Sequence, residues 1–339
     1  MKMNLSVRDL ELAHPFTISR ATIHHQPTLI VSLTLDGKTG YGEATSNQYY
    51  EVTTEGMSGI LEGLRPIIES HPFTTPEELY RITYPFLRKF PFAQCALDCA
   101  AHDLYGRLQQ QPLWQMWGGS DANLPLSSYT IGIDTIPKMI EKMQEKPWPI
   151  YKVKLGREND LDMIKALRKH TSAVIRVDAN CAWDWATTVE NSAALRALGV
   201  EFIEQPMPRE SGVRNLRRAF TKSALPLVAD ESCQREDDVE TCAGKFHAIN
   251  IKLVKCGGLT PALRMIKMAR ELNLDLMIGC MTESSVGISA VAQLLPFVDY
   301  ADVDGAILLK QDIARGGIKL EDGKVKLNER PGIGVELLP

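Results

Sequence analysis

Charged side chains recur at regular intervals from residue 150 onward, at the ends of short β-rich runs. They are Lys152-Val-Lys154, Asp178, Glu204, Asp230-Glu231, Lys252 and Asp302-Val-Asp304. The separations from Lys154 to Lys252 are 24, 26, 26 and 22 residues, so these groups occupy equivalent positions in successive units. Because buried strands exclude unpaired charge, charges that recur at one phase indicate a shared site.

Three of the carboxylates, Asp178, Glu204 and Asp230, come from adjacent units and form a hard-oxygen site for a divalent cation. Mg²⁺ fits such a site best, and Mn²⁺ is a plausible substitute. Lys154 precedes the carboxylates and Lys252 follows them, so the two amines would reach a metal-bound carboxylate from opposite faces. This arrangement suits removal of a proton from the adjacent carbon on one side and its return on the other. The cation would stabilise the intervening enediolate.

A lysine that acts as a base needs a lowered pKa, since a free lysine has a pKa of ~10.4. Lys152 and the cation are expected to lower the pKa of Lys154. Simpler interpretations exist for each group alone: a strand-end Asp is often a loop cap, and Lys152 with Lys154 could form a solvated edge. Charges that recur at one phase through successive units favour the functional interpretation.

The strands and helices that must position these residues recur at a regular spacing along the chain. Eight β-rich runs lie at 128–133, 150–156, 174–180, 200–206, 226–232, 248–253, 274–279 and 300–305. Helix-like stretches such as 161–170 and 260–272 fill the gaps. This alternation predicts a parallel (β/α) barrel, with the active site at the carboxyl ends of its strands. A doubly wound open sheet shares the alternation, but eight evenly spaced units favour closure.

The two ends of the chain do not follow this alternation of strands and helices. Residues 29–35 alternate, and Asp36-Gly37 is a hairpin signal, so antiparallel strands are expected before a helix with an apolar face at 93–108. We therefore predict an α+β capping domain over 1–124 and a barrel over 125–306. Residues 307–339 would contain a further hairpin and return to the capping domain.

Composition excludes several classes of protein. The 339 residues carry a formal charge of -4 and no basic run, so neither nucleic acid nor an anionic membrane is an expected partner. The longest apolar stretch, 286–298, is shorter than the ~20 residues of a membrane span. Seven scattered cysteines without a CxxC pair, and an N-terminus without a signal peptide, predict a reduced cytoplasmic protein. A homo-oligomer is also expected, since such assemblies are common among barrels.

The segments YKVKLG, IRVDAN, FIEQP, VADES and INIKL resemble the enolase superfamily, specifically its muconate-lactonizing-enzyme subgroup. The resemblance extends over essentially the whole chain and implies a (β/α)7β-type TIM barrel, an α/β fold, with an N-terminal capping domain completed by a C-terminal segment. It implies that Lys154 and Lys252 are the acid/base pair and that Asp178, Glu204 and Asp230 bind Mg²⁺. Lys152 would adjust the electrostatic environment of the acid/base pair, and Glu231 would lie next to the metal ligands without binding the metal itself.

Within that subgroup, an Asp-x-Asp on the eighth strand marks the dipeptide epimerases, and Asp302 with Asp304 matches it. Two carboxylates suit the free ammonium group of a dipeptide, although a capping pair at a strand end is the alternative. The resemblance implies epimerisation of L-Ala-D/L-Glu from the cell wall, with Arg20 as the partner of the glutamyl carboxylate. Arg20 lies about one residue from its expected place, which leaves a preference for hydrophobic dipeptides open. N-acylamino acid racemisation, o-succinylbenzoate synthesis, cycloisomerisation and a non-catalytic barrel are further alternatives.

Overall fold

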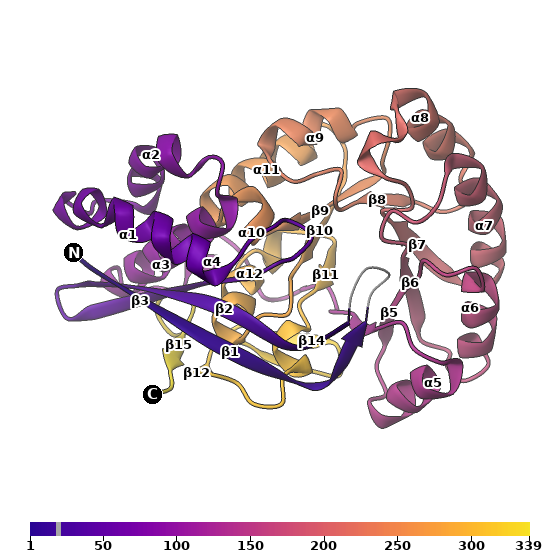
Figure 1. Ribbon diagram of the computed structural model, residues 1–339, viewed down its shortest axis with the longest axis horizontal. Helices are drawn as coiled ribbons and strands as arrows, with labels where there is room; N and C mark the ends of the chain where they lie inside the picture. The colour runs from indigo at the N-terminus through magenta and orange to yellow at the C-terminus, as the bar shows by residue number, and fades with distance from the viewer. Residues whose placement is uncertain (18–21) are drawn as a thin grey trace.

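The N-terminal part of the protein is a three-stranded antiparallel sheet. A computed structural model describes residues 1–17 and 22–339, and the sheet has the order β1 (Lys2–Thr17), β2 (Thr22–Leu35), β3 (Lys38–Thr45). Asp36 and Gly37 both adopt left-handed conformations, with φ of 49° and 72°, and so form the predicted turn. Figure 1 shows β1 and β2 as a long ribbon that runs from the N-terminal helices towards the barrel.

Eight parallel strands form the barrel and follow one another in sequence order around the sheet. They are β4 (Tyr129–Ile131), β5 (Ile150–Lys154), β6 (Val174–Asp178), β7 (Val200–Glu204), β8 (Leu227–Ala229), β9 (Ala248–Lys252), β10 (Asp275–Gly279) and β11 (Tyr300–Asp302). A parallel bridge between Ser127 and Ala301 joins the first strand to the last. A 3₁₀ turn (Gly305–Leu308) follows β11, so the predicted (β/α)7β architecture is confirmed.

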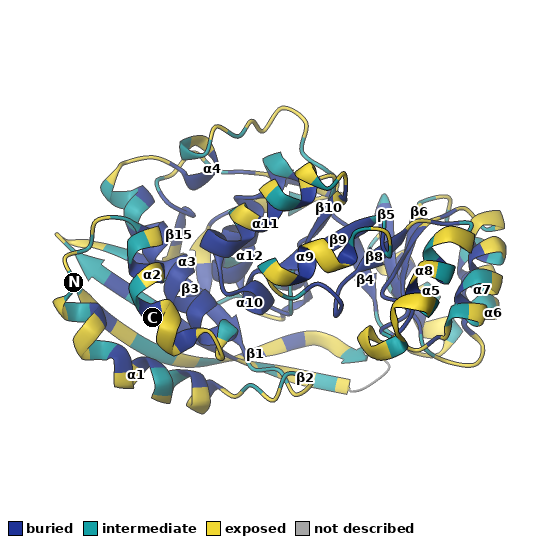
Figure 2. Ribbon diagram, turned by 90° about the horizontal axis from the view of Figure 1, so that it is seen from above, coloured by how far each residue is buried: buried dark blue, intermediate teal, exposed yellow. Residues whose placement is uncertain are grey.

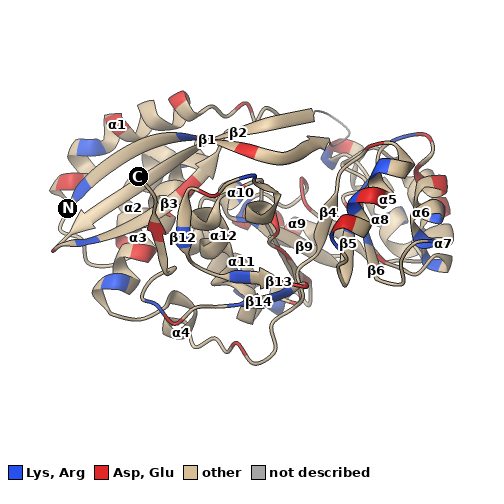
Figure 3. Cartoon of the chain, turned by 90° about the horizontal axis from the view of Figure 1, so that it is seen from below, with Lys and Arg blue, Asp and Glu red and all other residues tan. Residues whose placement is uncertain are grey.

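Helices cover the outside of the barrel. They are α5 (Ile136–Glu145), α6 (Asp160–Arg168), α7 (Trp185–Ala197), α8 (Val213–Lys222), α9 (Glu236–Cys242), the single turn α10 (Leu253–Cys256), α11 (Leu259–Glu271) and α12 (Ser285–Ala292). Figure 2 shows buried strands inside and exposed outer faces on α5 to α8. Figure 3 shows that acidic and basic residues are interspersed along these outer helices.

The inside of the barrel is apolar at its amino-terminal end. Its small cluster consists of the buried side chains Phe202, Val228, Ala248 and Met277, with Tyr300 packed against them. The Arg176 guanidinium lies 5.2 Å from the ring centres of both Phe202 and Tyr300. This layer fills the interior of the barrel below the carboxyl ends of the strands.

Helix α3 (Pro91–Leu108) connects the capping sheet to the barrel. The other helices of this part are α1 (Thr54–Ser70), α2 (Pro76–Leu87) and the short α4 (Leu113–Met116). Sequence periodicity predicts one apolar face for α3, but its buried residues lie on nearly every side. The reason is close packing against β3: a Cβ at Gly40 would lie 2.2 Å from the Leu104 nitrogen, and one at Gly42 would lie 2.1 Å from the Ala96 oxygen. The barrel helices α10 and α11 cover the opposite side of α3.

The C-terminal segment returns to the N-terminal part of the molecule. It contains two antiparallel pairs, β12 (Ala314–Gly316) with β15 (Val335–Leu337), and β13 (Lys319–Glu321) with β14 (Lys324–Lys326). The Ile333 amide donates to Asp103 of α3 at 2.8 Å, and Arg107 of α3 donates to the Val335 carbonyl at 2.6 Å. Among the described helices, none combines the length and apolar character that a membrane span requires.

Candidate active site

The charged residues predicted from their spacing converge at the carboxyl ends of the barrel strands. In the sheet register, Lys154 pairs with Asp178, and Asp178 pairs with Glu204. On the other side of the barrel, Gly279 of β10 pairs with both Lys252 and Asp302. The equal phase of these residues therefore places them in one layer.

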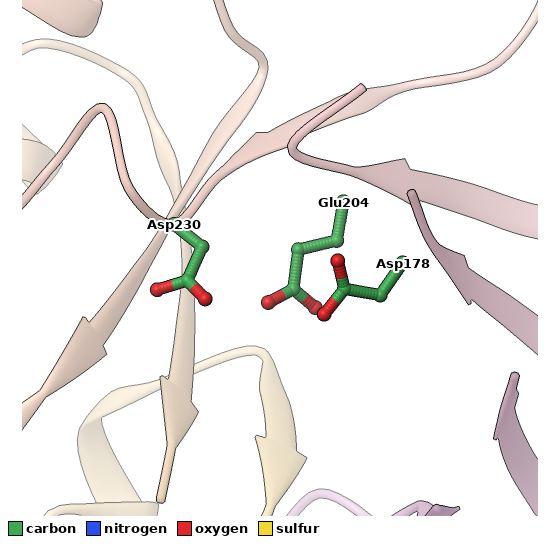
Figure 4. A group of neighbouring side chains, drawn as sticks. All are labelled: Asp178, Glu204 and Asp230. Atoms are coloured by element: carbon green, nitrogen blue, oxygen red, sulfur yellow. The ribbon is translucent and has the colours of Figure 1, made fainter. Parts of the chain in front are cut away.

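Three carboxylates form the centre of this layer. Asp178, Glu204 and Asp230 each offer one oxygen, and the three oxygens lie within 4.8 Å of one another (Figure 4). All three side chains are buried. Burial raises the pKa of Glu204 to about 7, and the neighbouring charge of Asp178 adds to the effect. Buried carboxylates at such short range are stable only with compensating positive charge, and three oxygen ligands match the preference of a divalent cation.

Lys152 is completely buried and lies beside Asp178 and Glu204 of the triad and beside Asp302. Its ammonium is 2.7 Å from Glu204 Oε2, 2.8 Å from Asp302 Oδ2 and 3.6 Å from Asp178 Oδ2. Burial alone would lower the pKa of Lys152, but the surrounding carboxylates, chiefly Asp302 and Glu204, raise it well above its ordinary value. Lys152 is therefore a fixed positive charge that joins the acidic groups.

Lys154 and Lys252 stand on opposite sides of the carboxylates. The Lys154 ammonium donates to Asp178 Oδ2 at 2.7 Å, and the Lys252 ammonium donates to Asp230 Oδ2 at 2.8 Å. Their strands, β5 and β9, are separated by the three strands that precede the carboxylates. Burial opposes the charge of Lys252, but Asp230 raises its pKa above the ordinary value.

The two aspartates of the last strand differ in their partners. Asp302 accepts from Ser128 Oγ at 2.6 Å and from Lys152 at 2.8 Å, whereas Asp304 accepts from the Thr130 amide at 2.6 Å. Burial raises the pKa of Asp304 to about 6, and the nearby charge of Asp302 contributes. The pKa of Asp302 is about 2, because Lys152 outweighs the effect of burial.

A cavity of about 470 Å³ opens above this layer. Lys152, Lys154, Lys252, Asp302 and Asp304 line its floor. Glu231 is buried and also lines it. The side walls come from β1 and β2, the loop after β3, the loop after β10 and the 3₁₀ turn after β11. Their lining residues are Phe16, Ile23, His25, Gln26, Pro27, Ser46, Asn47, Gln48, Tyr49, Tyr50, Cys280, Met281, Thr282 and Leu308.

Family models match both parts of the chain. The enolase C-terminal domain-like family matches residues 136–339, and the mandelate racemase / muconate lactonizing enzyme N-terminal domain matches residues 2–118. The chain belongs to the enolase superfamily. The strand-end motifs predicted this superfamily and its muconate-lactonizing-enzyme subgroup, which the N-terminal family model names together with mandelate racemase.

Several relatives in this superfamily are epimerases. A protein named L-Ala-D/L-amino acid epimerase from a Maribacter species is 54% identical over 340 residues, with 99% of both chains covered. One of the same name from Flavobacterium johnsoniae is 51% identical over 338 residues, with 100% of both covered. A solved dipeptide epimerase from Methylococcus capsulatus, complexed with Mg and the dipeptide L-Arg-D-Lys, is 32% identical, with a TM-score of 0.90 and 99% of both chains covered. The predicted resemblance and enzyme class, an isomerase, are thereby confirmed.

Asn250 and Lys255 are among the polar residues of this enolase-superfamily site that are not predicted from the sequence. Asn250 of β9 donates to Glu204 Oε1 at 2.9 Å, and Lys255 of α10 donates to Asp230. The period of 2 along β9, which places Asn250 on the same side as Lys252, could have indicated the first. Arg20, the predicted partner of a glutamyl carboxylate, lies outside the described residues.

Proposed function

We propose that this enzyme is a dipeptide epimerase that inverts the α-carbon of the C-terminal residue by proton transfer between Lys154 and Lys252. The observation that carries the proposal is the position of these two amines, on opposite sides of the Asp178, Glu204 and Asp230 carboxylates. A 1,1-proton transfer needs two groups that face one carbon from two sides. The names of the relatives support the same reaction.

The three carboxylates would hold one Mg²⁺, for which Mn²⁺ would substitute. Their hard-oxygen chemistry fits, and so does the charge of the site. Six buried carboxylates (Asp178, Glu204, Asp230, Glu231, Asp302 and Asp304) face four buried lysines (Lys152, Lys154, Lys252 and Lys255), which leaves two formal negative charges for a divalent cation. Such a cation supplies a Lewis acid for the negative charge that develops on the substrate carboxylate.

The lysines exchange roles between the two stereoisomers. For one isomer, Lys154 removes the α-proton as a neutral amine and the Lys252 ammonium delivers a proton to the opposite face; for the other isomer the direction reverses. The enediolate that forms between the two steps carries negative charge, which the neighbouring Lys152 ammonium offsets at short range. Because Lys152 is held by three carboxylates, it serves as a constant charge and not as a proton carrier.

Asp304 is assigned as the main partner of the dipeptide ammonium group. Asp302 already forms an ion pair with Lys152, whereas the described contact of Asp304 is a backbone amide. Both line the cavity, so Asp302 would contribute to the field around the ammonium. This requirement for a free ammonium separates a dipeptide from an N-acylamino acid or a succinylbenzoate precursor.

The side chain of the second residue would point towards the capping wall. L-Ala-D/L-Glu of peptidoglycan origin is the substrate that we propose first, with Arg20 as the cation for the glutamyl group. A hydrophobic dipeptide is the second candidate, because Phe16, Ile23 and Leu308 give the described wall an apolar part. The enzyme would act in the cytoplasm, where its seven free thiols stay reduced, and as a homo-oligomer.

The test is a screen of dipeptides with Mg²⁺ in D₂O, read by mass spectrometry as the gain of one deuterium at the C-terminal residue. Exchange with Ala-Glu supports the cell-wall substrate. Exchange only with hydrophobic dipeptides would support the proposed mechanism but assign the enzyme a hydrophobic substrate instead of Ala-Glu. Absence of exchange with every dipeptide, together with exchange of N-acylamino acids or turnover of a succinylbenzoate precursor, would refute the epimerase proposal.

A further inference from the structure

A fourth lysine lies behind the proposed metal site. Lys255 belongs to the single-turn helix α10, three residues after Lys252, and only 2% of its surface is exposed. Its ammonium donates to Asp230 Oδ1 and lies 2.6 Å from the Asp230 carbonyl oxygen. It is also 3.1 Å from the Cys233 carbonyl and 3.3 Å from the Asn250 carbonyl.

This environment fixes the Lys255 ammonium in place. Four acceptors surround three N–H donors, so every donor has a partner, as a buried cation requires. The acceptors belong to the end of β8, the loop after it and β9, so one ammonium ties these segments together. Lys255 is absent from the residues that line the described cavity, whereas Lys152, Lys154 and Lys252 all line it.

The two oxygens of Asp230 therefore have different lysine partners. Oδ1 receives the bond from Lys255, and Oδ2 receives the bond from Lys252 at 2.8 Å. The other two members of the triad are held by neutral donors in addition to the cavity lysines: the Asn180 amide donates to Asp178 Oδ1 at 3.0 Å, and Asn250 donates to Glu204 Oε1 at 2.9 Å.

We infer that Lys255 is a positioning residue that holds Asp230 in the orientation in which it serves as a metal ligand. The inference rests on the proposed metal role of Asp230. Asp230 Oδ1 is bonded to Lys255, which does not line the described cavity, and Oδ2 is bonded to Lys252, which does.

Two physical effects of removing Lys255 have opposite signs, which makes the inference testable. If the lysine were only a positive charge near the cation, Lys255→Met would remove repulsion and tighten Mg²⁺ binding. If it positions Asp230, the same change leaves the carboxylate free to turn and weakens binding. Loss of a group that orients a metal ligand costs about 10- to 100-fold in metal affinity.

The experiment measures Mg²⁺ binding by isothermal titration calorimetry on metal-stripped wild type and Lys255→Met. Lys267→Met, at an exposed position on α11, is the matched control. We expect the Mg²⁺ dissociation constant of Lys255→Met to rise about 10-fold or more and that of Lys267→Met to stay at the wild-type value. Unchanged or tighter Mg²⁺ binding by folded Lys255→Met would overturn the inference.

A second measurement separates positioning from a general loss of structure. At saturating Mg²⁺, the rate of α-proton exchange by Lys255→Met should recover to within a few-fold of wild type, because Lys255 touches no substrate atom; failure to recover in a folded protein would contradict the assigned role. If Lys255→Met does not fold, Lys255→Gln, which keeps one N–H donor for Asp230, replaces it with the same expected direction. Absence of Mg²⁺ binding by the wild type itself would refute the proposed metal site instead.

Discussion

The roles that we propose for Lys154 and Lys252 can be separated by the stereochemistry of exchange. In Lys154→Ala and in Lys252→Ala, one face of the substrate α-carbon loses its proton carrier while the other face keeps it. Epimerisation needs both faces, so each variant should lose it by about 10³-fold or more, given that one general acid or base contributes about 10² to 10⁴. Exchange of the α-proton with solvent needs only one face, so it should survive for one stereoisomer in each variant.

The structure limits the damage that these substitutions do to the fold. Removing one partner of a buried ion pair costs about 3–5 kcal/mol when the other is left bare. Here Asp178 keeps Lys152 at 3.6 Å after the loss of Lys154, and Asp230 keeps Lys255 after the loss of Lys252. We therefore expect the low end of this range, about 3 kcal/mol, and folded proteins in both cases.

The assay incubates the L,L and L,D forms of one dipeptide separately in D₂O with each variant and follows deuterium by mass spectrometry and configuration by chiral chromatography. The expected result is a mirror-image pattern, in which one variant exchanges only one isomer and the other variant exchanges only its epimer. Lys165→Ala, at an exposed site on α6, should behave as wild type. Exchange of the same isomer by both variants would refute the opposite-face assignment.

Three further results are expected. Asp304→Asn should raise KM for the dipeptide about 10- to 100-fold, since a hydrogen bond to a charged group is worth about 1.5–3 kcal/mol, and a KM equal to wild type in steady-state assays would remove Asp304 from the ammonium site. The pKa of Asp304 is about 6 and its ionised form binds the ammonium, so 1/KM should be constant above about pH 6 and fall below it, and this acid limb should be missing in Asp304→Asn. EDTA should abolish activity, and added Mg²⁺ or Mn²⁺ should restore it. In thermal melts, Mg²⁺ at 100 times its Kd should raise the free energy of unfolding by about 2.7 kcal/mol. Full activity after exhaustive chelation would argue against the metal site.

The residues that could be predicted from the sequence are those whose position is set by the strand period. Asp178, Glu204 and Asp230 each follow a buried strand at the same phase, and parallel strands bring such positions together. The turn at Asp36-Gly37 could also be predicted from the sequence, because it depends on local backbone geometry.

Other features depend on distances across the barrel, which sequence spacing does not encode. The ion pair between Lys152 and Asp302 joins residues 150 positions apart, and it divides the two aspartates of the last strand into unequal roles. Lys255 lies on a single helical turn where a lysine ordinarily reaches solvent. The burial of α3 on both sides follows from Gly40 and Gly42, which admit a helix backbone that a periodic pattern cannot reveal.

The seam where the barrel closes has a consequence for how the enzyme is made. Ser128 Oγ and Asp302 Oδ1, 174 residues apart, meet at 2.6 Å there, and the Thr130 amide meets Asp304 over the same interval. The carboxylate triad and the two lysines proposed to transfer protons lie between residues 154 and 252, so they are synthesised well before the last strand emerges from the ribosome. The pocket proposed for the ammonium group is therefore the last part of the site to form. On that proposal, a nascent chain would recognise a dipeptide only after its first and last barrel strands have joined.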